Sequence, residues 1–83
     1  MSSTLLSDDD VRTLLVAVGA DPDIAAVDYD RTFEDLDLDS LARAEFAARL
    51  KDRTRVDIED QLSALSTPNE ARRLALAGAG TAR

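Results

Sequence analysis

The 83-residue sequence contains no cysteine, no histidine and no tryptophan. The lack of cysteine excludes a disulfide framework, a thiolate metal site and a thiol nucleophile, and the lack of histidine removes the commonest general base and metal ligand. With only three glycines and two prolines, no glycine-rich loop can cradle a phosphate. Aromatic residues are equally few, so we expect a core of mainly Leu, Val, Ile and Ala around Tyr29, Phe33 and Phe46.

Basic residues are also scarce, at ten against 17 acidic residues, and the formal net charge is −7 at pH 7. This balance argues against binding nucleic acid, which requires clustered Lys and Arg. The acidic excess is local, because residues 21–40 hold eight acids and one base, Arg31. A solvated loop is the plain interpretation of such a run, but this run ends at Ser40.

Long apolar runs are missing as well. The longest covers residues 14–18, far short of a membrane span, and residues 1–8 lack the basic start and apolar stretch of a signal peptide. We therefore expect a cytoplasmic protein without a membrane partner. An apolar fraction of 45% suits a single small globular domain over residues 1–83.

The first helix is predicted over residues 8–18. Ser7 and Asp10 can form a capping box at its start, and Gly19 can end it. An apolar stripe at helical spacing lies between them: Val11, Leu14, Leu15 and Val18. Residues 20–38 lack a clear period and form a connection long enough to suggest function, with a short helical turn expected near 23–27.

The second helix is predicted to begin at Asp39 or Ser40, since both residue types cap well, and to continue through residues 41–53, which contain no Gly or Pro. One face is expected to point into the core: Ala42, Phe46, Ala47 and Leu50. A shallow apolar strip on a neighbouring face suits either a partner or slight extra burial: Leu41, Ala44 and Ala48.

Two further elements complete the prediction. Residues 56–60 alternate like a strand but have no ladder to join. We therefore expect an extended connector that runs into a short helix over about 59–65, with Leu62 and Leu65 inward. Thr67 and Glu70 mark the start of a last helix.

Gly78 is expected to end that last helix, leaving residues 78–83 as a frayed tail beyond an ordered core of about 5–77. The fold class is all-α: a four-helix bundle with a long loop between its first two helices and a short third helix.

Few residues in this sequence are candidates for catalysis or for binding a ligand. The alternating acids from Asp28 suggest a calcium loop, but the EF-hand pattern requires Gly and Glu where Phe33 and Asp39 stand. Ser40 remains as the candidate, although a serine at a helix start usually only caps. Here it closes the acidic loop, follows a second capping residue and precedes the most regular helix, so its hydroxyl is expected to be exposed beside free backbone N–H groups.

The segment around Ser40 resembles the phosphopantetheine attachment site of acyl carrier proteins. The resemblance is carried by Phe33 and Leu36, by the tripeptide Asp39-Ser40-Leu41 and by Glu45. The order and spacing of the predicted elements agree with that family over roughly residues 5–77.

The resemblance implies a non-catalytic carrier. Ser40 would bear a covalent 4′-phosphopantetheine arm, donated by coenzyme A through a phosphopantetheinyl transferase, with Asp39 and Leu41 completing the site. The thiol of the arm would hold an acyl chain as a thioester, which explains a carrier without cysteine. Asp39 either helps the magnesium–coenzyme A complex of the transferase to engage the serine or only caps the helix.

Two departures from the family pattern stand out. Asp37 occupies a position where the family commonly has Gly. Residues 41–53 carry a net positive charge, whereas fatty-acid carriers usually have an acidic second helix, so the acidic surface lies upstream of Ser40. We therefore expect a dedicated secondary pathway, polyketide assembly, with acyltransferase or ketosynthase partners. The expected partner-binding residues are Asp35, Asp37, Leu41, Ala44, Glu45 and Ala48.

Three alternatives remain open from the sequence. A peptidyl carrier of nonribosomal peptide synthesis shares the serine but typically has a Gly-Gly-His/Asp-Ser site, unlike residues 37–40. A cofactor-free acidic helical adaptor would need Ser40 only as a cap. Small residues such as Ala44, Ala47 and Ala48 could leave room for cargo or allow close helix packing, and we favour packing in a monomeric, freestanding chain.

Overall fold

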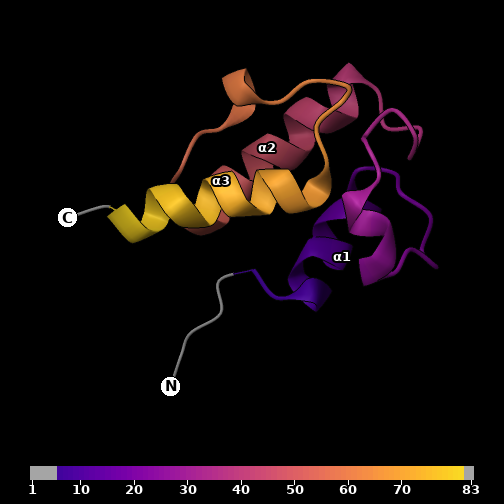
Figure 1. The fold of residues 1–83 in the computed structure, drawn as a ribbon, viewed down its shortest axis with the longest axis horizontal. Helices are drawn as coiled ribbons and strands as arrows, with labels where there is room; N and C mark the ends of the chain where they lie inside the picture. The colour runs from indigo at the N-terminus through magenta and orange to yellow at the C-terminus, as the bar shows by residue number, and fades with distance from the viewer. Residues whose placement is uncertain (1–5, 82–83) are drawn as a thin grey trace.

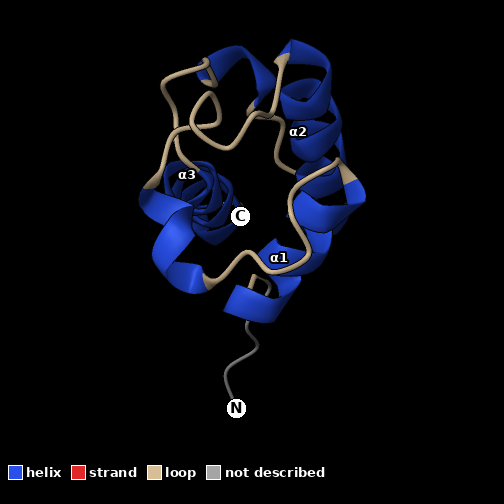
Figure 2. Ribbon diagram, turned by 90° about the vertical axis from the view of Figure 1, so that its right-hand side faces the viewer, coloured by secondary structure: helices blue, strands red, loops and turns tan. Residues whose placement is uncertain are grey.

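The computed structural model describes residues 6–81, and their side chains as far as Gly78. Leu5 of the expected core and the last two residues of the expected tail lie outside this range. The described chain consists of helices and loops without a strand, as Figure 2 shows, so the all-helical prediction is confirmed. Its elements are α1 (Asp8–Ala17), η1 (Ala26–Asp30), α2 (Ser40–Thr54), η2 (Glu59–Gln61) and α3 (Pro68–Thr81), where η denotes a 3-10 helix.

Helix α1 follows the predicted signals at both ends. The Ser7 hydroxyl accepts a hydrogen bond from the Asp10 N–H (3.2 Å), and the Asp10 carboxylate accepts one from the Ser7 N–H (3.1 Å). Gly19 ends the helix with a φ of 113°, and the helix is one residue shorter than expected because Val18 is its C-cap. The capping box and the glycine stop are thus confirmed.

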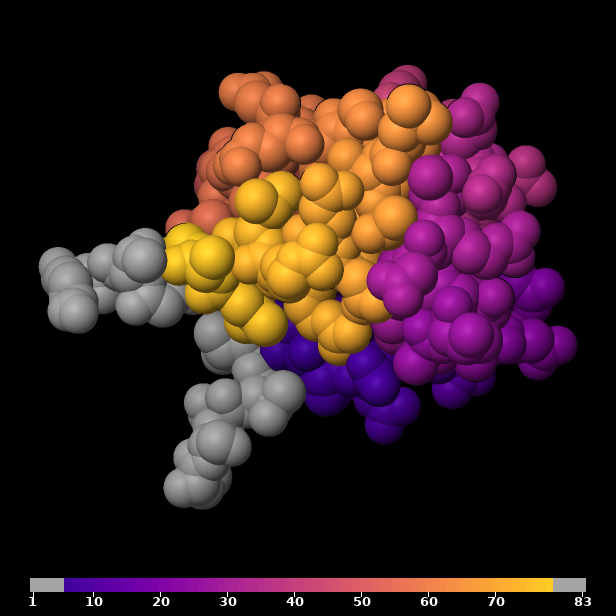
Figure 3. Space-filling view, in the orientation of Figure 1, coloured from indigo at the N-terminus to yellow at the C-terminus, as the bar shows by residue number. Residues whose placement is uncertain are grey.

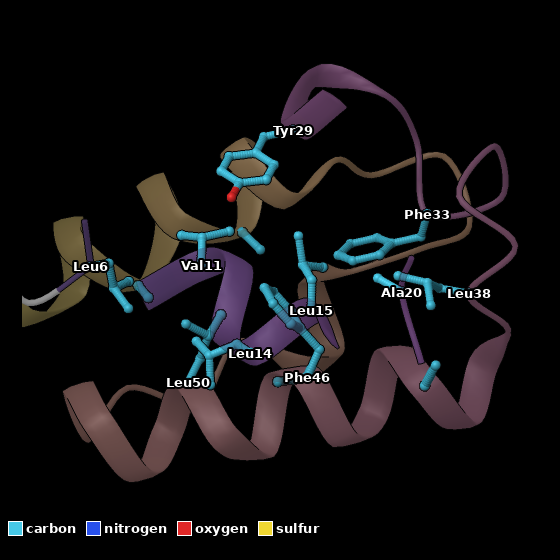
Figure 4. Close-up of a cluster of buried hydrophobic side chains, with 14 of the residues drawn as sticks. Leu6, Val11, Leu14, Leu15, Ala20, Tyr29, Phe33, Leu38, Phe46 and Leu50 are labelled. Atoms are coloured by element: carbon cyan, nitrogen blue, oxygen red, sulfur yellow. The ribbon is translucent and has the colours of Figure 1, made fainter. Parts of the chain in front are cut away.

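One hydrophobic core joins the three α-helices to the long loop (Figure 4). The rings of Phe33 and Phe46 meet edge to face with their centroids 5.5 Å apart, which fastens the loop to α2. The Tyr29 hydroxyl donates a hydrogen bond to the Asp8 carbonyl oxygen (2.9 Å), which fastens the same loop to α1. All three aromatic residues are fully buried, as their scarcity suggested.

The long loop is therefore ordered by its own apolar residues. Its helical turn lies at Ala26–Asp30, later than the expected 23–27. Figures 1 and 3, drawn in the same orientation, show the loop in violet and magenta at one end of the molecule, and its turn η1 contacts both α1 and α3. The loop thus delivers the chain to the first residue of α2 from a fixed direction.

The prediction for residues 59–65 is wrong in two respects. Only the turn η2 (Glu59–Gln61) is helical, and Leu65, expected inward, is 71% exposed. The serines explain this, because the hydroxyls of Ser63 and Ser66 accept hydrogen bonds from the backbone N–H groups of Leu65 and Ser63. Such local bonds compete with a helix, so the described chain has three α-helices and a 3-10 turn in place of the fourth.

The last helix begins as predicted and ends later. The Thr67 hydroxyl accepts a hydrogen bond from the Glu70 N–H (3.0 Å), which confirms the cap. Gly78 does not end the helix, which continues to Thr81. A Cβ atom at Gly78 would lie 2.7 Å from Cγ1 of Val56, so this glycine allows close contact with the 56–58 connector rather than a stop.

The three α-helices have 10, 15 and 14 residues. None of those within residues 6–81 has both the length and the apolar character needed to cross a membrane.

Candidate functional site

A left-handed turn precedes the candidate serine. The Leu38 N–H donates to the Phe33 carbonyl oxygen (2.9 Å), the Asp37 N–H donates to that of Glu34 (3.0 Å), and Asp37 has a φ of 61°. These bonds and this conformation form a Schellman motif. Phe33 and Leu38, at the two ends of the turn, are both buried in the core. The turn therefore fixes the direction in which the chain enters α2.

The family's usual glycine at position 37 now has a physical reason. Gly adopts a positive φ without the Cβ crowding that other residues suffer, and Asp is among the side chains that tolerate it best. Asp37 thus preserves the backbone of the turn while adding a carboxylate next to the site.

Asp39, and not Ser40, caps α2. Its Oδ1 accepts a hydrogen bond from the Ala42 N–H (2.9 Å), and its carbonyl oxygen accepts one from the Arg43 N–H (2.9 Å). Because Asp39 satisfies the cap, the side chain of Ser40 has no structural task at the helix start. The sequence left two residues competing for one cap, and the structure assigns it to Asp39.

Ser40 is the first residue of α2 and is exposed. Its hydroxyl has no hydrogen-bond partner among residues 6–81. The N–H groups of Ser40 and Leu41 precede the first intrahelical bond of α2, so they face the space beside the hydroxyl. A phosphodiester on the Ser40 oxygen would lie at the positive end of the helix dipole. The residues present therefore fit a covalent phosphate-linked group.

An open hollow adjoins the helix start. Residues from three parts of the chain line it: Glu34, Asp37, Leu38, Asp39, Arg43 and Ala64. The loop carrying Ala64 is held there because its carbonyl oxygen accepts a hydrogen bond from the Glu34 N–H (3.0 Å), and that of Ser66 accepts one from the Phe33 N–H (2.9 Å). Arg43 is the only cation among the lining residues.

The expected partner-binding residues on α2 differ in exposure. Leu41 is 69% exposed, and Glu45 and Ala48 are also exposed, whereas Ala44 is partly buried. The core-facing set of the same helix, including Phe46 and Leu50, is buried as predicted. The strip of Leu41, Ala44 and Ala48 is thus mainly an outer face of α2.

Asp35 and Asp37 are exposed on the loop before Ser40 and line a second open hollow. This hollow also contains Asp21, Asp23 and Asp28, with Arg31 as its one cation, 3.8 Å from the Asp28 carboxylate. Within residues 6–81, no three Asp or Glu side chains are arranged to hold a metal ion. The structure therefore places the acidic excess on the surface that leads to Ser40.

Similarity to known proteins indicates the family of this chain. A family model described as the phosphopantetheine attachment site matches residues 9–73. The actinorhodin polyketide synthase acyl carrier protein of Streptomyces coelicolor is 40% identical over 72 residues, which are 82% of this chain and 84% of that protein. No solved structure gave a significant match.

These similarities define a class of non-catalytic carriers that bear a covalent 4′-phosphopantetheine group. The chain belongs to the acyl carrier protein family.

Two contributors to the site were missed by reasoning from the sequence. Arg43 was counted only in the charge of its helix, and Ala64 was assigned to a helix that does not form. Helical spacing could have indicated Arg43, because residues three apart share a face. Nothing in the local sequence places residue 64 next to residue 34, since that contact depends on the path of the whole chain.

Proposed function

We propose that Ser40 is the attachment residue and that the chain presents acyl or polyketide intermediates, as thioesters on its arm, to enzymes of polyketide biosynthesis. One observation carries the assignment of the residue: Asp39 supplies the helix cap, so the exposed Ser40 hydroxyl stands free at the first position of α2. When bound, the arm supplies the thiol that the sequence lacks. The protein's own part is to hold and orient that arm, which raises the concentration of cargo at partner active sites.

The choice of pathway is supported by two independent features. The relative with 40% identity is named for a polyketide synthase. Residues 41–53 of this chain carry Arg43, Arg49, Lys51 and Arg53 against two acids. Partners that expect an acidic second helix would meet an unfavourable charge here.

We place the partner surface on the turn before Ser40 and on the outer face of α2. Asp35 and Asp37 supply negative charge, while Leu41 offers an exposed apolar anchor. Glu45 and Ala48 extend this face along the helix, and the partly buried Ala44 contributes less area. A surface that combines charges with one apolar anchor suits brief docking to an acyltransferase, a ketosynthase or the phosphopantetheinyl transferase. The charges speed the encounter of the two proteins, and only a small area has to be buried.

We further propose that cargo stays outside the core. Helices α2 and α3 contact each other, and their core-facing side chains have little or no exposure, including Phe46, Ala47, Ala71 and Ala75. The close contact between Gly78 and Val56 leaves little unfilled space between the C-terminal part of α3 and the 56–58 connector. Opening this interface for an acyl chain would expose apolar area that a chain of this size can hardly spare.

Intact-protein mass spectrometry tests the proposal. After incubation with coenzyme A and a broad-specificity phosphopantetheinyl transferase, the chain should gain the mass of one phosphopantetheinyl group. Unchanged mass would leave the acidic adaptor as the better account. Loading with an amino acid by an adenylating partner, rather than with a malonyl group by an acyltransferase, would instead favour a peptidyl carrier.

The proposal also includes a monomeric state and a cytoplasmic location. The absence of cysteine is compatible with a reducing compartment. Light scattering of the protein carrying its arm would measure the monomer mass directly, and a dimer mass would contradict this part.

A further inference from the structure

We propose that Arg43 holds the phosphodiester of the arm in the hollow beside Ser40 and thereby sets the direction in which the arm leaves the protein. This inference rests on the proposed attachment at Ser40. Arg43 then has a positioning role toward the arm, in addition to its share of the positive charge of α2.

The helical register brings Arg43 to the attachment site. Residues three apart lie on the same face of a helix, about 5–6 Å apart at Cβ. A helical side chain also leans toward the N-terminus and covers the turn that precedes it. In agreement with this, Arg43 lines the hollow together with Asp39, the residue that caps α2 immediately before Ser40.

Arg43 is also uncommitted. Within residues 6–81 it forms no ion pair and no side-chain hydrogen bond, whereas Arg53 on the same helix pairs with Asp10 at 3.0 Å and Lys51 pairs with Asp57 at 3.8 Å. The planar Arg43 guanidinium therefore keeps its N–H donors free for an anionic group, and two oxygens of a phosphodiester are well suited to accept them.

Charge around the hollow makes this task necessary. Glu34, Asp37 and Asp39 line the same hollow and repel an anionic phosphodiester. Arg43 is the one cation among the lining residues and offsets that repulsion, and the free N–H groups at the start of α2 add to its effect. Leu38 and Ala64 give the hollow an apolar part against which the pantetheine chain can lie.

The structure offers a matched control for this proposal. Arg49 lies farther along α2, is exposed and likewise forms no ion pair within the described residues. The variants Arg43→Gln and Arg49→Gln remove the same charge from the same helix. Arg43→Lys keeps the charge and loses the planar fork, so it should retain part of the effect.

The experiment uses the protein carrying its arm, with loading confirmed by intact mass for every variant. The measured quantity is the offset of the 31P resonance of the phosphodiester from its position in the same protein unfolded in urea. Arg43→Gln should reduce that offset about twofold or more, as for loss of a partly exposed ion pair. Arg49→Gln should leave it unchanged, and high salt should move the wild-type resonance toward that of Arg43→Gln.

A second measurement tests the proposal even if a variant cannot be loaded with the arm. In the wild-type protein, the Nε–Hε resonance of Arg43 should shift between the forms without and with the arm, and that of Arg49 should not. Equal 31P offsets in all loaded variants, or an unmoved Arg43 resonance, would overturn the inference and leave Arg43 as a contact for partner enzymes. Failure of the wild-type chain to gain mass would instead overturn the proposed function.

Discussion

Asp37 occupies the same position in its turn that Gly19 occupies at the end of α1. In both Schellman motifs this residue has a positive φ, 61° for Asp37 and 113° for Gly19. In both, the following N–H bonds a carbonyl oxygen five residues back, from Leu38 to Phe33 and from Ala20 to Leu15. The protein thus uses one backbone device twice, with glycine at the distant turn and a strained acid beside the site.

This equivalence predicts that Asp37→Gly stabilises the protein. Relief of the left-handed strain should exceed the extra flexibility of Gly in the unfolded chain, for a gain of about 0.5–1 kcal/mol. Urea unfolding measures the change. Asp37→Asn is the control, because it removes the charge but remains a non-glycine residue, and it should recover less. A Gly variant less stable than wild type would contradict the account of the turn.

Because Asp39 caps α2 and Ser40 does not, we predict that substitutions at the two positions lower the free energy of unfolding by different amounts. Asp39→Ala removes the cap of α2 and should lower the free energy of unfolding by about 1 kcal/mol. Ser40→Ala removes an exposed hydroxyl without a partner and should stay within about 0.5 kcal/mol of wild type. Equal losses in urea unfolding would mean that Ser40 has a structural task after all. Asp39→Ser, which restores a capping oxygen, should recover most of the loss.

The lowered pKa of Asp10 indicates how the free energy of unfolding should depend on pH under acidic conditions. The Ser7 N–H, and then the Arg53 guanidinium at 3.0 Å, hold the pKa of Asp10 below its ordinary value of 3.8. The unfolded chain therefore binds this proton more readily than the folded one. The stabilising contribution of Asp10 is complete above the unfolded-state pKa and is lost as pH falls through the lowered folded-state pKa.

Asp10→Asn should accordingly be less stable at neutral pH and should lose less stability than wild type on acidification below about pH 5. Urea unfolding at a series of pH values gives the two slopes. Arg53→Gln should flatten the wild-type slope only partly, because the Ser7 N–H still lowers the pKa. Parallel slopes for wild type and Asp10→Asn would exclude this role.

The position of the acidic surface predicts which charges steer the transferase. Asp35→Lys, on the turn before Ser40, should slow loading about two- to tenfold at low salt. Arg49→Glu changes the charge by the same amount on the far part of α2 and should have a smaller effect. The difference should shrink at high salt. A larger effect at Arg49 than at Asp35 would place the docking surface along the helix instead.

Local patterns accounted for most of the helices because their signals are short-ranged. The capping box at Ser7, the stop at Gly19 and the cap at Thr67 depend on residues within a few positions, and each formed as predicted. The core face of α2 followed from helical spacing alone. These features needed no knowledge of the distant chain.

The failures occurred where distant or competing contacts decide. Gly78 is a packing residue because Val56 lies against it, and no local signal distinguishes that from a helix stop. Leu65 faces outward because serine hydroxyls bond the nearby backbone and residues 64–66 pair with the turn before Ser40. The site is only partly predictable from the sequence. Ser40 and the two capping candidates, Asp39 and Ser40, follow from local pattern, but the choice of Asp39 as the cap needed the structure. The hollow depends on contacts between distant parts of the chain.

Localising the added group tests the central claim most directly. The wild-type chain and Ser40→Ala, both checked for folding by urea unfolding, are treated with coenzyme A and the transferase, digested and examined by tandem mass spectrometry. We expect one phosphopantetheinyl group on the Ser40 hydroxyl of the wild-type chain and none on Ser40→Ala. A group on another residue, or undiminished loading of the folded Ser40→Ala variant, would contradict that claim.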